Sequence, residues 1–287
     1  GTGQPVTATF VQWLNPNGIG FIFDPAITFY FGTAGSAVAA VFVFCLGACL
    51  GSFANACAMR LVRDEDFVAT ASRCRGCDTR LAWHENLPVI GFLKQRGRCR
   101  RCGMKLSPRY IIVEILGGLA LLSYAASLPL GIAAGFGVAL VLTGIACLTD
   151  LESLTLHPAI LSLLGVTGIC STVAADAGLF TWHLTSAQAL AGTLVSVLLP
   201  MAINAAYRLV SGRNGFGEGD YWLLAAFGAW LGPVMGPALF IAASWLGAMV
   251  GVGMMLAGRA SAMTKLPFGL FAGSAFILWP NLFTRVF

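Results

Sequence analysis

Two aspartates stand where apolar segments meet polar ones, and their carboxylates can do chemistry. Asp150 follows a long apolar run, and Asp220 opens another directly after Gly217-x-Gly219. An ionisable group at membrane depth is costly, rare and usually functional. Such carboxylates can exchange protons with a reacting group or bind a cation. The alternative is that each is an ordinary helix-end residue in contact with water, and hydropathy alone does not separate the two interpretations.

Four of the nine cysteines form two Cys-x2-Cys pairs, Cys74/Cys77 and Cys99/Cys102, separated by 21 residues. This spacing is typical of a four-thiolate zinc site, in which two tight turns bring four sulfurs around one tetrahedral ion. With all four positions occupied by protein, such a zinc ion is structural rather than catalytic. A pair of disulfides or a set of free thiols is the alternative. The other cysteines lie in apolar segments and are expected to be packing residues: Cys45, Cys49, Cys57, Cys147 and Cys170.

The elements that must position these residues are membrane helices. Of the 287 residues, 57% are apolar and only 10% are charged, whereas about a quarter are charged in an ordinary soluble protein. One transmembrane helix needs about 20 mostly apolar residues, so the chain has enough for up to about eight. This composition excludes disordered, collagen-like, coiled-coil and secreted disulfide-rich proteins.

The apolar segments predict an all-α polytopic membrane protein with about eight transmembrane helices. A small Cys-bearing domain is inserted between the first and the second. The sixth segment is short, and it either enters part of the bilayer or continues through a break at Gly232-Pro233. The predicted spans are 32–59, 110–128, 131–149, 158–173, 187–207, 220–231, 237–256 and 266–282.

The distribution of basic residues predicts the orientation. Twelve of the 17 Lys and Arg residues lie between Arg60 and Arg109, and loops rich in Lys and Arg face the cytoplasm. With this loop inside, 16 of the 17 fall on the cytoplasmic side and only Arg285 lies outside. Both aspartates then lie at the cytoplasmic boundary, and residues 1–31 lie outside. A cytoplasmic loop is in a reducing compartment, which favours zinc over disulfides.

Several motifs in order resemble those of the type IV prepilin peptidases, GxGD-type intramembrane aspartyl proteases of pilus and type II secretion systems. Each motif alone is weak, but the ordered set is specific. Its members are Gly51-Ser52-Phe53-x-Asn55, Trp83-His84-Glu85-Asn86-Leu87-Pro88, Arg96-Gly97-Arg98-Cys99, Ser107-x-Arg109-Tyr110, Val113-Glu114, Asp150 with Leu156 and Pro158, Gly217-x-Gly219-Asp220, and Leu266-Pro267-Phe268-Gly269.

The resemblance implies that Asp150 and Asp220 are catalytic and that Gly217 and Gly219 support the second aspartate. It implies cleavage of prepilin or pseudopilin leaders at the cytoplasmic face of a bacterial inner membrane, within a peptidase domain spanning 110–287. Members with the Cys-bearing loop, here 60–109, are also expected to methylate the new amino terminus with S-adenosylmethionine. No sequence feature identifies the residues that bind this methyl donor. Glu85, Asn86 and Gly97 are candidates by location only.

Two departures from the family pattern affect substrate contacts. Trp222 stands where members commonly have a polar residue two positions after the second aspartate. His157 separates Leu156 from Pro158, where Leu-Pro is typically contiguous. Both aspartates are kept, so the catalytic expectation is unchanged.

A proton- or cation-coupled transporter could use the same aspartates, and a membrane scaffold could dock a partner through the basic loop. We see no internal repeat of the kind many transporters show. We expect lipid contact but no nucleic-acid partner, and the oligomeric state stays open. Gly47 and Gly51, four residues apart in a GxxxG pattern, predict close helix packing. Glu114 is interpreted as a structural hydrogen-bonding group rather than a further acid near the site.

Overall fold

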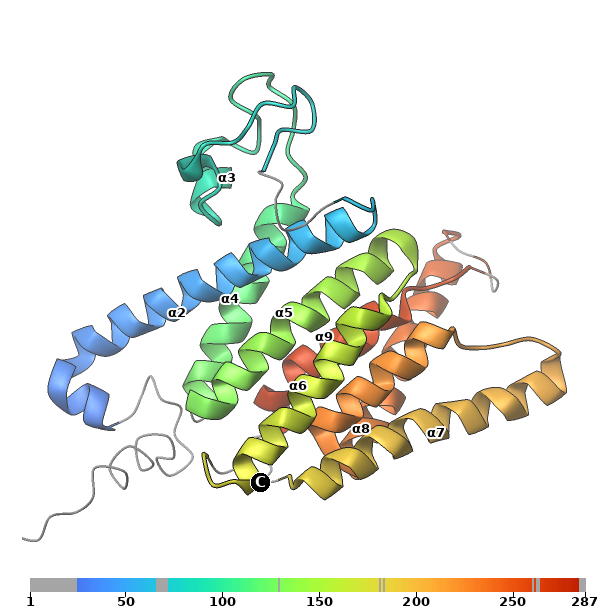
Figure 1. Ribbon diagram of the computed structural model, residues 1–287. Helices are drawn as coiled ribbons and strands as arrows, with labels where there is room; N and C mark the ends of the chain where they lie inside the picture. Colours follow the sequence, from blue (N-terminus) through green and yellow to red (C-terminus); the bar gives the residue numbers. More distant parts are fainter. Residues whose placement is uncertain are drawn as a thin grey trace, which may run out of the picture.

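The structure is a computed structural model that describes residues 25–65, 72–128, 130–180, 182, 184–259, 261 and 264–283. For 25–34 and 281–283 only the backbone is described. The expectations for residues 1–24 and for Arg285 therefore lie outside the described part of the chain. The architecture is all-helical, as predicted (Figure 1).

Six of the described helices are long and apolar enough to cross a membrane, which makes this a multi-pass membrane protein. A shorter apolar helix, α9, follows them. The main boundaries lie within a few residues of those predicted, although the first helix begins earlier than expected. The helices are α2 (Pro25–Leu61), α4 (Arg109–Ser127), α5 (Leu130–Ser153), α6 (Pro158–Asp176), α7 (Ser186–Ser211), α8 (Glu218–Leu256) and α9 (Phe268–Phe283).

Helix α8 contains the break that the sequence predicted. Gly232 has φ 77° and ψ −176°, a backbone conformation open mainly to glycine, and Pro233 follows it. A Cβ placed on Gly236 would lie 3.1 Å from the Cα atom of Gly228, whereas residues eight apart in a straight helix are separated by about 12 Å. The chain therefore folds back at Gly232, so α8 has two arms. When the two arms of α8 are counted separately, the seven long helices of the described chain match the eight predicted apolar segments. The first arm is only roughly 21 Å long.

Glycines set the contact between α2 and α4. A Cβ on Gly47 would lie 2.5 Å from the carbonyl oxygen of Gly117, and one on Gly51 would lie 2.7 Å from that of Val113. Both distances are too short for any side chain, so the two backbones meet directly. The close packing predicted from the Gly47/Gly51 step is confirmed, and it occurs within the chain.

Helix α5 lies at the centre, with α2, α4, α6 and α9 around it. Its Phe136 is in ring contact with Trp230 of α8 and Phe276 of α9, at centroid distances of 4.9 and 5.8 Å. The buried polar ends are paired, because Trp230 Nε1 donates to the carbonyl of Leu164 and Tyr124 Oη donates to that of Ile277. These contacts fix α5 and α9 side by side.

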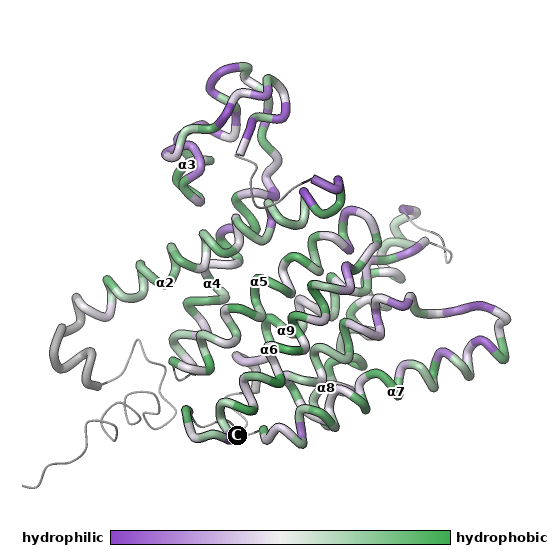
Figure 2. The backbone as a smooth tube through the Cα atoms, viewed as in Figure 1, coloured by the Kyte–Doolittle hydropathy of each residue, from purple (hydrophilic) through white to green (hydrophobic). Residues whose placement is uncertain are grey.

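The Cys-bearing loop stands at one end of the bundle, beyond the ends of α2 and α4, and contains the short helices η2 (Trp83–Glu85) and α3 (Ile90–Lys94) (Figure 1). We call this end of the bundle the loop end. Polar segments gather in this loop and at the connection between α7 and α8, whereas the helices are mainly apolar (Figure 2). The predicted inserted domain thus exists as a separate polar lobe on an apolar bundle.

Candidate aspartate site and cysteine cluster

The four cysteines of the two Cys-x2-Cys pairs converge. Their sulfur atoms all lie within 4.8 Å of one another, and Cys74 Sγ is 3.7 Å from Cys102 Sγ. Zinc–sulfur bonds of about 2.3 Å in a tetrahedron place sulfurs about 3.8 Å apart. All nine cysteines are free thiols, so the structure contains no disulfide at this cluster. The residues present fit a zinc ion.

The two pairs adopt the same local conformation. Arg73 and Arg80 form an antiparallel bridge around the first pair, as Arg98 and Lys105 do around the second. In each turn the first cysteine's N–H donates to the carbonyl five residues on, at 2.9 Å. Backbone N–H groups two residues on point at the first sulfur, from Gly76 to Cys74 and from Arg101 to Cys99. N–H groups directed at sulfur stabilise thiolates, the form that binds metal.

The four thiols do not ionise alike. Hydrogen bonds from Thr79 lower the pKa of Cys77 from 9.0 to about 6. At Cys102 a backbone hydrogen bond from Met104 lowers the pKa, but desolvation and the other three thiols outweigh it, and the pKa rises to about 11. Four sulfurs this close repel one another as anions. A divalent cation removes that repulsion, which is a second reason why the cluster suits zinc.

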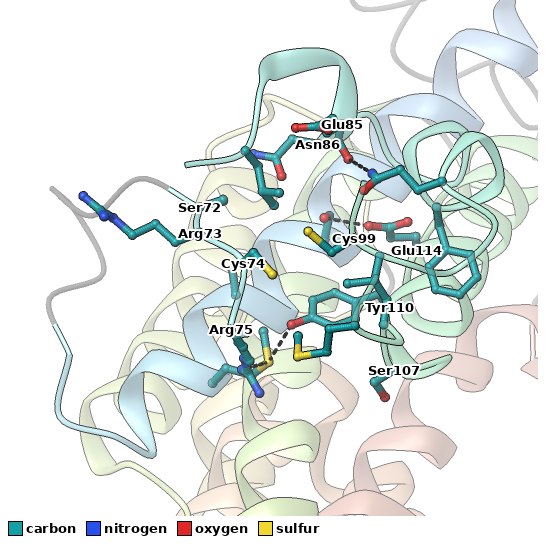
Figure 3. A pocket seen from close by; sticks show the side chains of 18 of the residues that line it. Ser72, Arg73, Cys74, Arg75, Glu85, Asn86, Cys99, Ser107, Tyr110 and Glu114 are labelled. Carbon is teal, nitrogen blue, oxygen red and sulfur yellow. Dashed lines mark hydrogen bonds between the residues drawn. The ribbon is translucent and has the colours of Figure 1, made fainter. Parts of the chain in front are cut away.

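Glu114 of α4 ties this lobe to the membrane helices. It is buried, and its Oε1 atom accepts from Ser52 Oγ of α2 at 2.8 Å (Figure 3). Its Oε2 atom accepts from the N–H of Val89 at 2.7 Å. Val89 has φ 61°, which is strained for a β-branched residue. The carboxylate therefore holds a strained turn of the lobe against two helices. Its interpretation as a structural group agrees with these contacts.

Replacing Glu114 tests this tie. Glu114→Gln keeps the shape but loses two charge-assisted hydrogen bonds, each worth about 1.5–3 kcal/mol. We expect trypsin to cut the Arg-rich loop at least fivefold faster, with the zinc content retained. Glu65→Gln removes only an exposed contact to Arg63 and should leave the cutting rate unchanged. Equal trypsin sensitivity of the two variants would show that Glu114 does not anchor the lobe.

A cavity of about 790 Å³ lies between this lobe and the loop ends of α2 and α4. Glu85 and Asn86, two of the residues singled out by location, line it together with Glu114. Gly97, the third, is not among its lining residues; it has φ 64° and packs against the ring of Phe92. Neither aspartate of the candidate pair lines this cavity, so the structure offers two separate places for chemistry.

Asp150 lies in the last turn of α5, slightly inside the helix rather than at its predicted end. Its residue is only 5% exposed. The first-turn backbone N–H groups of Gly269 and Leu270 in α9 act on its carboxyl, as expected where a helix N-terminus meets an anion. The Oδ2 atom has no hydrogen-bond partner among the described residues. A buried carboxylate oxygen without a hydrogen-bond partner is available to take a proton.

Asp220 lies in the first turn of α8 and is half-buried. Its Oδ2 atom accepts from the N–H of Gly217 at 2.9 Å, which fixes the carboxyl over the helix N-terminus. The preceding loop is held by Asn204 of α7, whose Oδ1 atom accepts from the N–H of Gly215 at 2.7 Å. Phe216 of the same loop packs on Phe268 of α9 at 5.7 Å, so the loop is anchored from two helices.

Leu156 lies close to residues that adjoin both aspartates. A Cβ on Gly219 would lie 2.8 Å from Leu156 Cβ, and one on Gly269 would lie 3.1 Å from Leu156 Cδ2 and 2.9 Å from Asp150 Oδ2. The charge on Asp150 also acts on Asp220. The structure therefore places two carboxylates that are 70 residues apart in sequence in the same region, because Leu156 lies against Gly219, which precedes Asp220, and against Gly269, which adjoins the Asp150 carboxyl.

The two departures from the family pattern lie beside this site. His157 is exposed and stands at the N-cap position of α6, directly before Pro158, while Leu156 lies close to Gly219 and Gly269. Trp222 is 56% exposed on α8.

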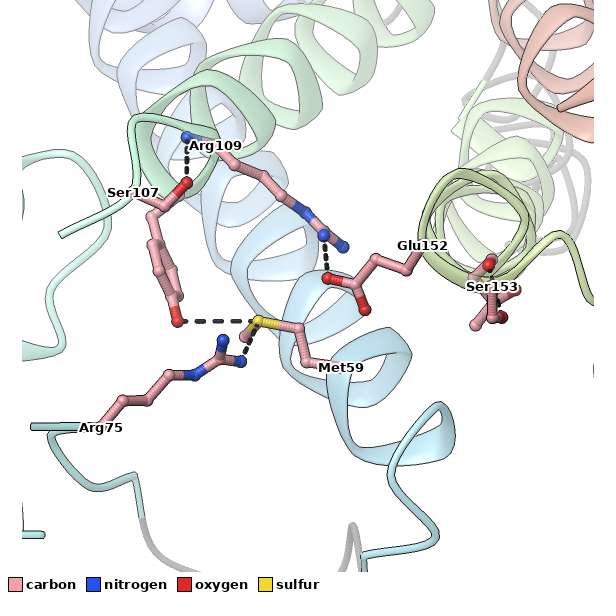
Figure 4. Close-up of polar contacts among 8 residues, drawn as sticks. Met59, Arg75, Ser107, Arg109, Glu152 and Ser153 are labelled. Carbon is pink, nitrogen blue, oxygen red and sulfur yellow. Dashed lines mark hydrogen bonds and ion pairs between the residues drawn. The ribbon is translucent and has the colours of Figure 1, made fainter. Parts of the chain in front are cut away.

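An ion pair lies between the cavity and the aspartate site. Arg109, at the start of α4, pairs with Glu152 of α5, two residues beyond Asp150 (Figure 4). Ser107 and Tyr110, on either side of Arg109, line the cavity. Sequence reasoning did not single out this pair, although opposite charges at two predicted helix ends were a visible signal. The contribution of Gly269 to Asp150 was also missed, because only its motif, and not its partner, can be read from sequence.

Comparison with known proteins identifies relatives of both parts. The bacterial peptidase A24 N-terminal domain matches residues 45–128, and the type IV leader peptidase family matches residues 137–252. No solved structure matches the chain.

The similar curated proteins are prepilin leader peptidase/N-methyltransferases. The one from Myxococcus xanthus is 38% identical over 232 residues, which are 79% of this chain and 66% of the relative. Those from Aeromonas hydrophila and Pseudomonas putida are each 33% identical, over 75% of this chain and 73% and 74% of the relatives. The match thus spans just under two thirds of the first relative and about three quarters of the others.

Proposed function

Because this chain belongs to the type IV leader peptidase family and is therefore a membrane peptidase, we propose that Asp150 and Asp220 cut the leaders of type IV prepilins or type II pseudopilins. The observation that carries this proposal is the convergence of the two carboxylates around Leu156. Two acids at one site hold one proton between them most easily, because like charges at short distance repel. The pair then contains both an acid and a base.

The chemistry uses both groups. The ionised carboxylate takes a proton from a water, whose oxygen bonds to the scissile carbonyl carbon, while the protonated one donates to the carbonyl oxygen. The carbon–nitrogen bond then breaks, and the leaving nitrogen receives the proton held by the base. The Oδ2 atom of Asp150, which is buried and has no hydrogen-bond partner among the described residues, can take the proton that the pair shares, and the half-buried Asp220 is the carboxyl that water and a peptide can reach.

The substrate fits the layout of the bundle. A prepilin has a hydrophobic helix that can stay in lipid and a basic leader that stays in water, and both aspartates lie at the polar loop end. We place this end in the cytoplasm and the protein in the bacterial inner membrane. The support is the density of Lys and Arg in the 60–109 loop. Arg208 and Arg213, at and just beyond the end of α7, belong to the same side.

Gly269→Ala tests whether cleavage depends on the close approach of Gly269 to the Asp150 carboxyl. The added methyl group would lie 2.9 Å from Asp150 Oδ2, so the carboxyl or α9 must shift. Misplacement of a catalytic group by about 1 Å can cost about 100-fold in rate, and we expect a fall of 10- to 100-fold in kcat/KM for leader cleavage. Gly253→Ala, where a Cβ meets nothing within 4 Å, should cleave normally. Normal cleavage by Gly269→Ala would show that the geometry of the site does not depend on Gly269.

The Cys-bearing lobe and the names of the relatives support a second activity, N-methylation of the amino terminus that cleavage exposes. S-adenosylmethionine, when bound, supplies the methyl group as an electrophile. In our proposal zinc is structural: Cys74, Cys77, Cys99 and Cys102 hold the lobe in shape. A lobe with little apolar core gains most of its folding energy from such a metal.

Mass spectrometry of a prepilin incubated with the purified full chain tests both activities together. We expect loss of the leader without S-adenosylmethionine, and loss of the leader plus one methyl group with it. A transporter that uses the same aspartates, or a scaffold, would leave the prepilin intact. An intact prepilin would therefore refute the peptidase, and a cleaved but unmethylated product would refute only the methyltransferase.

A further inference from the structure

We propose that an apolar patch of the Cys-bearing lobe, formed by Trp83, Ile90 and Leu93, enters the headgroup layer of an anionic bilayer leaflet. These side chains are 78%, 50% and 60% exposed, although the lobe around them is polar. None of the three is among the residues that line the cavity, so the patch is separate from it. The inference goes beyond the proposed function, because it needs neither leader cleavage nor methyl transfer.

The three side chains lie on two short elements that pack together. Ile90 and Leu93 are three residues apart in α3 and therefore share one face of it. Trp83 is the first residue of η2, and Gly91 of α3 lies directly against the carbonyl of Glu85, the last residue of η2. Large apolar side chains scattered singly over a surface are ordinary, but a group of them on adjoining elements marks an interaction site.

The depth of α3 identifies the partner as lipid. The N–H of Val89, the residue before α3, donates to Glu114 Oε2 at 2.7 Å. Glu114 is the sixth residue of α4, roughly 7.5 Å inside the start of that helix. Its other oxygen accepts from Ser52, nine residues before the end of α2. Both helices are long and apolar enough to cross a membrane, so α3 starts beside two spans rather than above their ends.

This level corresponds to the headgroup layer. The layer is about 5–8 Å thick on each side of the hydrocarbon core, which is comparable to the depth of Glu114 in α4. Most of the lobe stands beyond the helix ends, and Figure 1 shows α3 on the side of the lobe that faces the bundle. Exposed apolar side chains on α3 therefore meet lipid rather than water, and tryptophan is enriched in this layer.

The charge of the lobe selects an anionic leaflet. Residues 72–109 contain ten Lys and Arg residues and two acidic ones, and a zinc ion with four thiolates offsets only roughly two of these positive charges. Lys94 and Arg96 are exposed at the end of α3, where long cationic side chains can reach phosphates while their stems stay in apolar surroundings. The cytoplasmic leaflet carries anionic lipids, and our orientation places the loop end there. A basic prepilin leader has the same sign of charge and suits this patch poorly.

A photoreactive lipid tests the contact. We would place the purified full chain in nanodiscs of phosphatidylglycerol and phosphatidylcholine that include a phosphatidylglycerol with a diazirine near its headgroup. Trypsin releases 81–94 as one peptide, because Arg80 precedes it and Lys94 ends it. We expect this peptide to carry at least tenfold more label than 97–105, the second cysteine turn of the same lobe. Nanodiscs and probe made of phosphatidylcholine alone should give at least threefold less label.

Two variants with the same change in net charge separate the patch from the general charge of the lobe. Leu93→Asp puts a carboxylate on the patch and should reduce the label in 81–94 at least fivefold. Arg100→Gln removes one positive charge at an exposed position of the second cysteine turn and should change that label less than twofold. Zinc content shows whether the lobe of each variant is folded.

Label in the membrane helices shows that the probe reached the chain. A wild-type chain with labelled helices but an unlabelled 81–94 peptide would overturn the proposal, whatever the variants do. Equal labelling of a folded Leu93→Asp would also overturn it. If 81–94 is unlabelled and becomes protected from trypsin only when a prepilin is added, the patch binds protein instead of lipid.

Discussion

Asp150→Asn and Asp220→Asn should each reduce leader cleavage about 1,000-fold or more. An amide has nearly the same shape as a carboxyl group but cannot exchange the proton that hydrolysis requires, and general acid–base groups typically contribute 10²- to 10⁴-fold. Because the two acids act as one unit, the double variant should lose little more than either single variant. The measurement is the rate of leader release from a prepilin under single-turnover conditions.

Matched controls separate this effect from unfolding. Asp64→Asn makes the same chemical change at an exposed position of the loop and should cleave at the wild-type rate. The two active-site variants should keep their zinc and their thermal stability, because neither carboxyl is a partner in an ion pair among the described residues. Full processing by either variant would defeat the assignment of the pair.

Cys74→Ser should abolish stoichiometric zinc binding and with it the methyl transfer. Removing one of four thiolates opens the tetrahedron, and structural zinc contributes about 10–16 kcal/mol to the folding of small domains. We expect the zinc content to fall from one per chain by at least tenfold and methylation to fall with it. Leader cleavage should fall less, because the aspartates are held by α5, α8 and α9 rather than by the lobe. Metal analysis and product mass check both.

The symmetry of the two turns supplies further comparisons. Cys99→Ser should behave like Cys74→Ser, since the two residues have equivalent hydrogen bonds in equivalent turns. Cys170→Ser, on an exposed face of α6 away from the cluster, should retain full zinc. Unchanged zinc content in Cys74→Ser would refute its role as a ligand.

Composition and local sequence patterns determined a large part of this protein. The apolar segments predicted the helices, since crossing a membrane requires runs of apolar residues that satisfy their own backbone hydrogen bonds. The Cys-x2-Cys spacing predicted the cluster, because the turn that directs two cysteines at one metal ion is formed by residues next to each other in the sequence. Gly232-Pro233 indicated a possible break in the helix for the same reason, because the backbone conformation there depends on these two residues themselves.

Contacts between distant segments were decided only by the tertiary structure. No spacing indicates that Gly269 leaves room for Asp150, that Glu114 holds the N–H of Val89, or that Arg109 reaches Glu152. Nor can the cavity be read from the sequence, because it exists only between the lobe and two helices that are far apart along the chain. The pattern of apolar residues in a helix shows which face is apolar, but many different helices could pack against that face. The choice among them depends on where glycines let two backbones meet, and that is fixed only when the whole bundle packs.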